Sequence, residues 1–248
     1  AEWQDFSVQV AGCKRNMHMT DSIPSNPMDK VPRPKPRKDE ATQEPAEKAY
    51  TVPEMQHILS CLENEPLKWR AFIRLVADTG IRRGEACGLQ WADVDFKGQA
   101  ITIRHNLQYS TQKGVYLAAP KNGKTRQVDI ADDVTALLRQ LRAEQATKAI
   151  SKYVFTQDGS PEPMHPQSPT HYFRQFGKRY GVEDFHPHKL RHTSASIALT
   201  NGADVASVSE RLGHSDTAIT LRTYTHANAE SIRRAGQIVR DALKGKAE

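Results

Sequence analysis

Residues 185–226 concentrate side chains that can bind or attack an anion. This stretch holds five of the ten histidines of the chain. Arg191 follows His188 by three residues, a spacing that places both on one face of a helix, and Tyr224 lies near the end of the stretch. Imidazole, guanidinium and phenol groups gathered in one segment suit chemistry on an anionic group such as a phosphodiester.

Short helices have to position these groups. His188 and Arg191 lie in a helical pattern, and the Leu-Gly-His triplet at 212–214 ends the next one, because glycine is favoured just past a helix C-terminus. Ser215 and Asp216 can cap a further short helix, which would carry Tyr224.

A second cluster, residues 78–85 (DTGIRRGE), lies at the end of a helix that begins at Pro66. The Asp-Thr-Gly triplet alone is typical of an aspartic protease. That site needs two carboxylates that share a proton, and the chain has no second Asp-Thr-Gly or Asp-Ser-Gly triplet to supply one. The arginines Arg82 and Arg83 and the acid Glu85 therefore need another explanation.

Taken together, these motifs resemble the catalytic region of the tyrosine recombinases, the phage-type integrases. That family carries T-G-x-R-x-x-E, then H-x-x-R, then L-G-H, then a tyrosine about ten residues on, and the same order occurs here across residues 79–224. The resemblance makes Glu85 a buried supporting group and leaves Arg83 on the surface. It implies these catalytic residues: Arg82, His188, Arg191, His214 and Tyr224.

The resemblance adds a catalytic lysine on a β-hairpin. Three strands are predicted at 100–107, 115–118 and 127–130, and Asn122-Gly123 between the last two is a strong hairpin signal. Lys121 matches the position of the family's lysine best, with Lys124 as the second candidate. On spacing alone, the basic residues of this loop are also consistent with ordinary solvated charge.

The predicted fold class is α+β, mainly helical, with a small three-stranded antiparallel sheet, and the resemblance implies a tyrosine recombinase catalytic domain. Helical periodicity and capping signals predict helices at 51–62, from 66 into the Asp-Thr-Gly cluster, at 133–146, from 169 or 170 to 180, and at 228–243.

The chain divides into two parts in this interpretation. Residues 49–248 form the catalytic domain, and residues 1–48 are an N-terminal remnant of a core-binding domain followed by a basic, proline-rich linker. The linker sequence KVPRPKPRK at 30–38 is extended because proline blocks helix formation. It is either a plain tether or a strap along a phosphate backbone through Lys35, Arg37 and Lys38.

Composition is compatible with a polyanionic partner. The formal net charge is +6, the pI is about 9.2 and the mean hydropathy is −0.67. No apolar run is long enough to span a membrane, and three well-separated cysteines favour a reducing interior. The resemblance implies a cytoplasmic, nucleoid-associated protein. Beyond the linker, the candidate DNA contacts are Lys124 and one face of the helix that ends at Tyr180: Arg174, Lys178 and Arg179.

The resemblance implies a site-specific DNA recombinase that cleaves and rejoins strands through a covalent 3′-phosphotyrosine, without a metal or other cofactor. The implied partner is a double-stranded recombination site, with a homotetramer formed on DNA in which helix 228–243 docks on a neighbour.

A type IB topoisomerase-like activity would use the same chemistry. A helix-turn-helix binding module over residues 203–223 is the competing non-catalytic interpretation. A zinc site at His188 and His192 is disfavoured because Lys189 and Arg191 would repel a cation.

Overall fold

The computed structural model describes residues 49–121, 123–148 and 150–213. All of them belong to the second of two units of the chain, which spans Ala46–Glu248. The helices of this part are, in chain order, α2 (Val52–Leu62), α3 (Leu67–Thr79), α4 (Arg83–Cys87), the 3-10 turn η2 (Trp91–Asp93), α5 (Asp132–Lys148), α6 (Ser168–Tyr180), α7 (Pro187–Thr200) and α8 (Val205–Leu212).

Local signals set the ends of these helices. At α2, the Thr51 side chain accepts from the Glu54 backbone N–H while the Glu54 carboxylate accepts from the Thr51 backbone, which is the predicted capping box. Helix α3 ends at Gly80, whose φ of 64° lies in the left-handed region. Helix α8 ends in the same way at Gly213, with φ 68°. The predicted helices that fall within the described residues are confirmed, with ends shifted by at most a few positions.

The strands form two small antiparallel sheets. In the first, the strand order is β1 (Val94–Asp95), β2 (Ala100–Ile103) and β5 (Arg126–Asp129). The second is the hairpin of β3 (Asn106–Ser110) and β4 (Gly114–Ala118). A mainly helical α+β fold with a small three-stranded antiparallel sheet is therefore confirmed.

The predicted strand pairing was wrong in two respects. The strand expected at 100–107 is two strands, interrupted at Arg104 and His105, and each half pairs with a different partner. The Asn122-Gly123 signal does not join 115–118 to 127–130 in a hairpin, because β4 pairs with β3 and β5 pairs with β2. A turn does form there, since the Gly123 N–H donates to the Pro120 carbonyl at 2.8 Å. A turn signal is local, whereas the choice of partner strand depends on which apolar faces need cover.

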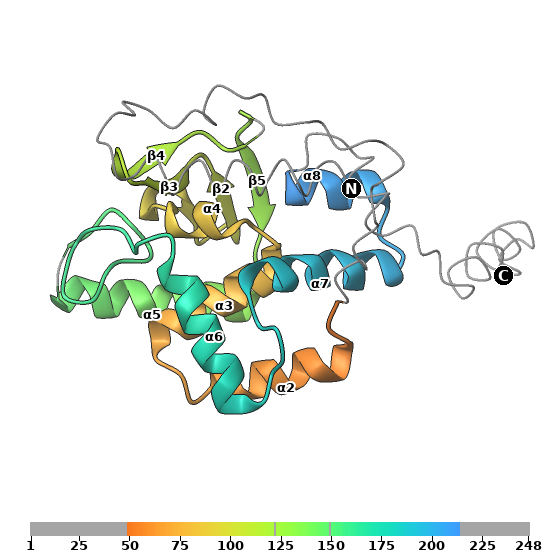
Figure 1. Cartoon of the computed structure of the whole chain (residues 1–248). Coiled ribbons are helices and arrows are strands. Elements are labelled where there is room, and N and C mark those ends of the chain that lie inside the picture. The colour runs from red at the N-terminus through yellow and green to blue at the C-terminus, as the bar shows by residue number, and fades with distance from the viewer. Residues whose placement is uncertain (1–48, 122, 149, 214–248) are drawn as a thin grey trace, which may run out of the picture. The chain divides into compact units, whose positions relative to one another are not determined.

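Helix α3 is the centre of the packing. It contacts α5 and α7, while in the view of Figure 1 the strands, α4 and α8 lie on one side of these helices and α2 and α6 on the other. The core includes fully buried aromatic and aliphatic side chains from all of these layers, among them Ile58, Phe72, Ile101, Phe155 and Phe173. This core holds the end of α3, the start of α7 and the end of α8 close together.

None of the helices that the structure describes is long and apolar enough to cross a membrane.

Candidate functional site

A hollow of about 540 Å³ brings together four of the six residues predicted to be catalytic. Arg82, Lys121, His188 and Arg191 all line it, although 109 positions separate Arg82 from Arg191 in the chain. Its other lining residues are Ile81, Arg83, Gly84, Asn106, Thr170, His186 and Pro187. The hollow is called the arginine pocket below.

Each of these side chains comes from the end of an element. Arg82 is the N-cap residue of α4, two positions after the left-handed Gly80 that ends α3. Lys121 follows β4 in an exposed turn. His188 and Arg191 lie in the first turns of α7, whose N-cap is His186; the His186 Nδ1 accepts from the Lys189 backbone N–H at 3.2 Å. His186 therefore caps the N-terminus of α7.

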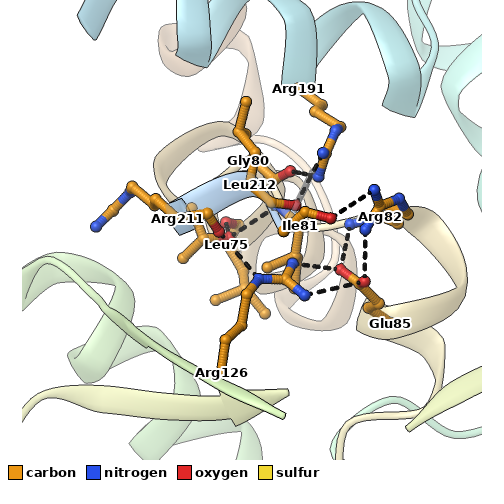
Figure 2. A network of polar contacts seen from close by, with 11 residues as sticks. Leu75, Gly80, Ile81, Arg82, Glu85, Arg126, Arg191, Arg211 and Leu212 are labelled. Carbon is orange, nitrogen blue, oxygen red and sulfur yellow. Dashed lines mark hydrogen bonds and ion pairs between the residues drawn. The ribbon is translucent and has the colours of Figure 1, made fainter. Parts of the chain in front are cut away.

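A buried carboxylate holds Arg82 in place (Figure 2). Glu85 has no exposed side-chain surface. Its Oε1 accepts from Arg82 Nη1 at 3.0 Å, and its Oε2 accepts from the Arg82 backbone N–H at 2.9 Å. The prediction that Glu85 is buried is confirmed, and Arg83 is exposed as predicted.

Arg126 on β5 makes the second set of contacts to the same carboxylate. Arg126 Nη1 and Nη2 donate to the two Glu85 oxygens at 3.1 Å and 2.7 Å, in the bidentate geometry that a guanidinium favours. Burial would raise the pKa of the Glu85 carboxyl, but the hydrogen bonds and positive charges of Arg126 and Arg82 outweigh it and lower that pKa below its ordinary value.

Two backbone carbonyls anchor Arg191. It is only 5% exposed, and its Nη1 and Nη2 donate to the Gly80 and Leu212 carbonyls at 2.6 Å and 2.8 Å. Arg82 Nη2 makes a similar contact, donating to the Gly213 carbonyl at 2.9 Å. The guanidinium groups of Arg82 and Arg191 are thus fixed by backbone carbonyls, and both residues line the arginine pocket.

The chain also matches a model of the phage integrase family over residues 48–231. It belongs to this family.

Curated relatives in the family are tyrosine recombinases. The chain is 29% identical over 196 residues to tyrosine recombinase XerA of Thermococcus onnurineus strain NA1, covering 78% of this chain and 63% of that protein. It is 29% identical over 167 residues to tyrosine recombinase XerC of Xanthomonas axonopodis pv. citri strain 306, covering 67% of this chain and 49% of that protein. The chain thus spans between about half and two thirds of the length of these relatives.

Solved structures show the same fold. A crystal structure of XerA recombinase superposes with a TM-score of 0.63 at 26% identity and covers 78% of this chain and 65% of that one. The Tn1549 transposon integrase in complex with transposon right end DNA superposes with a TM-score of 0.71 at 21% identity, covering 92% of this chain and 76% of that one. Because only 21% of the residues are identical, the similarity to the Tn1549 integrase shows a shared fold and nothing further.

Several predicted features lie outside the described residues. These are His214 and Tyr224, the linker residues Lys35, Arg37 and Lys38, the second half of the helix-turn-helix interpretation, and the helix predicted at 228–243. Their assignments remain predictions.

The predicted basic face of α6 is divided in the structure. Arg174 and Lys178 are exposed and line a second hollow of about 670 Å³, which shares Thr170 and His186 with the arginine pocket. Arg179 does not belong with them: its Nη2 donates to both carboxylate oxygens of Glu65, at 2.8 Å and 2.7 Å. Arg179 is thus set apart from Arg174 and Lys178 by its pairing with a buried acid on a neighbouring element, and a phosphate contact by Arg179 stays a prediction.

Within residues 49–213, apart from the undescribed positions 122 and 149, no group of three or more His, Cys, Asp or Glu side chains is arranged to hold a metal ion.

Arg126 is the site residue whose position the sequence did not indicate. It comes just before the strand predicted at 127–130, in the loop with Lys121 and Lys124, where its charge resembles that of any solvated basic residue. Its side chain is nevertheless only 8% exposed. The one available signal was its position two residues before Val128, which places both side chains on the same face of β5. That signal does not distinguish a buried arginine from an exposed one.

Proposed function

We propose that this chain contains the catalytic domain of a site-specific DNA recombinase, residues 49–248, which cuts and rejoins strands through a covalent 3′-phosphotyrosine. The observation that carries the proposal is the arginine pocket, where two anchored guanidinium groups, a lysine and a histidine converge. The membership of the phage integrase family supports it. The relatives that this chain partly spans are named tyrosine recombinases.

The pocket suits a phosphodiester in its transition state. In-line attack at phosphorus builds negative charge on the nonbridging oxygens, and stabilising that charge is the main task of such a site. Arg82 and Arg191 supply planar forks of N–H donors that match phosphate oxygens better than lysine would. His214, next to the Gly213 carbonyl that Arg82 contacts, is proposed as a third donor.

In the covalent step, the Tyr224 hydroxyl loses one proton and the departing 5′-oxygen gains one. The Tyr224 oxygen forms a bond to phosphorus, and the bond from phosphorus to the 5′-oxygen breaks. A phenol with its ordinary pKa of about 10 is ionised in about one molecule in 10³ at pH 7, so His188 is proposed to accept its proton. Lys121 is proposed to donate a proton to the departing 5′-oxygen. A 5′-hydroxyl of a second strand then attacks the phosphotyrosine, which releases Tyr224 and joins the strands.

The second hollow offers a path for the flanking DNA backbone. Because it adjoins the arginine pocket through Thr170 and His186, Arg174 and Lys178 are proposed to contact phosphates next to the scissile one. Lys124 and the linker residues Lys35, Arg37 and Lys38 are proposed as further backbone contacts. The proposed assembly is a homotetramer on a recombination site in the nucleoid, with helix 228–243 docking on a neighbour.

The test is trapping of the covalent intermediate. The protein is incubated with a nicked duplex recombination site that loses a short fragment on cleavage, and adducts are resolved on denaturing gels. Tyr224→Phe should abolish the adduct while DNA affinity stays near wild type, because the arginines remain. Tyr109→Phe, on the exposed β3–β4 hairpin, is the matched control and should form the adduct at the wild-type level. Full cleavage by Tyr224→Phe, or an adduct mapped by mass spectrometry to another residue, would refute the assignment.

A further inference from the structure

The C-terminal end of α8 is held by three arginines from three different elements. The carbonyls of three successive residues accept hydrogen bonds: Arg211 from Arg126 Nε at 3.0 Å, Leu212 from Arg191 Nη2 at 2.8 Å, and Gly213 from Arg82 Nη2 at 2.9 Å. The last carbonyls of a helix lack intrahelical partners and carry its partial negative charge. The three arginines therefore donate hydrogen bonds to these free carbonyls and also neutralise the partial negative charge of the helix end.

Arg126 is the member of this set that the chemistry of the pocket does not use. It is absent from the lining of the arginine pocket, and its side chain is 8% exposed. All three of its nitrogens donate, Nε to the Arg211 carbonyl and both Nη to the Glu85 carboxylate. A buried arginine with every nitrogen occupied is a structural connector.

The packing around Arg126 leaves little freedom. A Cβ added to Gly213 would lie 2.7 Å from the Arg126 Cζ and Nη1, so the guanidinium lies directly against the backbone at the end of α8. The Glu85 carboxylate accepts four N–H groups, two from Arg126 and two from Arg82. Because a carboxylate offers about four acceptor sites, the position of Arg126 determines where the carboxylate can meet Arg82.

We propose that Arg126 is a positioning residue for strand cleavage: it locks the Glu85 carboxylate and the end of α8 together, and so sets the direction in which Arg82 faces the arginine pocket. The inference rests on the proposed function for its catalytic meaning. Arg126 acts through Arg82 and Glu85 and does not touch the DNA.

Lysine in place of Arg126 separates positioning from charge. Arg126→Lys keeps one positive charge near Glu85, but an ammonium cannot donate to both carboxylate oxygens and to the Arg211 carbonyl in the planar geometry of a guanidinium. If strand cleavage needs only a positive charge at position 126, Arg126→Lys should be active. If it needs the planar geometry of the guanidinium, this variant should be slow.

The experiment compares Arg126→Lys with Arg179→Lys in the full chain. Arg179 also donates to both oxygens of a buried glutamate, but it lies outside the arginine pocket. With saturating protein and the nicked site, Arg126→Lys should slow single-turnover adduct formation by about 10²-fold, the usual cost of misplacing a reacting group by about 1 Å. DNA affinity should change less than about threefold. Arg179→Lys should cleave at the wild-type rate.

Hydrogen exchange provides a readout that does not depend on activity. In Arg126→Lys, peptides covering residues 80–86 and 205–213 should exchange faster than in wild type, while a peptide covering α2 should not change. Wild-type exchange in both peptides together with wild-type cleavage by Arg126→Lys would overturn the inference and leave the proposed function standing. If the wild-type protein forms no adduct, the proposed function fails, and the exchange data alone decide whether Arg126 locks α8 to Arg82.

A second variant covers the case in which Arg126→Lys does not fold. Gly213→Ala keeps all three arginines and Glu85, but its methyl group would displace the Arg126 guanidinium. It should show the same slow cleavage and the same faster exchange at residues 80–86. Cleavage at the wild-type rate by this variant would show that the placement of Arg126 is irrelevant.

Discussion

Two buried glutamates, Glu65 and Glu85, are paired with arginines in this protein, and they serve different ends. Glu65 lies in the turn between α2 and α3 and accepts hydrogen bonds from Arg179 and from the Tyr172 hydroxyl, both on α6. Glu85 lies in α4 and accepts from Arg82 and Arg126. Each carboxylate joins elements that are far apart in the chain.

The arginines differ in what lies on their other side. Arg179 is 44% exposed, and its guanidinium lies 5.5 Å from the Tyr172 ring centre and 5.8 Å from that of Tyr180. Tyr172 in turn stacks on Trp69 at 3.8 Å. This is a clamp between α6 and the start of α3, and it faces aromatic rings and solvent.

Around Glu85, the guanidinium groups of Arg82 and Arg126 each donate to a backbone carbonyl at the end of α8 as well as to the carboxylate (Figure 2). Arg82 also lines the arginine pocket. Arg82 is 26% exposed and Arg126 is 8% exposed. Of these two buried Glu–Arg pairs, only the one at Glu85 also presents a charge, that of Arg82, to the arginine pocket.

The largest effect is expected from neutralising each glutamate. Glu85→Gln leaves the nearly buried Arg126 guanidinium without its counter-charge, so the free energy of unfolding should fall by about 3–5 kcal/mol, as for other broken buried pairs. Glu65→Gln should cost about 1 kcal/mol, because Arg179 can turn to solvent. Urea denaturation of both variants measures this, and equal losses would show that burial of the arginine does not decide the cost.

The next largest effect is a difference in cleavage rate between a variant of the Glu85 pair and a variant of the Glu65 pair. Arg82→Lys should slow adduct formation on the nicked site by about 10²–10³-fold, the range found when one preorganised donor is removed from a transition state. Arg179→Lys should remain within twofold of wild type, since it lies outside the arginine pocket. Rapid-quench kinetics at saturating protein provide the comparison. A similar loss in both variants would mean that the two clamps act through stability alone.

Acidification should affect the Glu85 pair in a defined direction. The pKa of Glu85 is lowered in the folded protein, whereas an unfolded glutamate titrates near about 4.3. Its stabilising contribution is therefore complete above about pH 4.3 and is lost as the pH falls through the lower folded value. Denaturation curves between pH 3 and 7 should show wild type losing more stability on acidification than Glu85→Gln. Parallel pH profiles for the two proteins would contradict a lowered pKa.

The smallest effect concerns the aromatic side of the Glu65 clamp. Tyr172→Phe removes one hydrogen bond to Glu65 and keeps the stacking on Trp69, so the free energy of unfolding should fall by about 0.5–1 kcal/mol. Adduct formation should not change. Thermal unfolding and the nicked-site assay test both statements, and a loss of activity without a loss of stability would connect this clamp to the arginine pocket.

Local features of the protein could be predicted from neighbouring residues in the chain. The capping box at Thr51 and Glu54 predicted the start of α2, because its hydrogen bonds form between near neighbours in the chain. Gly213 predicted the end of α8, because a left-handed residue is needed there. The pattern of His188 and Arg191 predicted one shared helix face, and both residues line one hollow. The order of the motifs along the chain also indicated the family.

Contacts between residues far apart in the chain depend on how the whole domain packs. Strand partners depend on burial across the whole domain, so the Asn122-Gly123 signal did not reveal that β5 pairs with β2. Arg126 and Arg179 both occur among basic residues that appear solvated in the sequence, yet each lies against a glutamate that is 41 or 114 positions away. A charge is placed by the acceptors that the folded chain brings within about 3 Å of it. No local pattern encodes that distance, because it arises only when α4, β5 and α8 pack together.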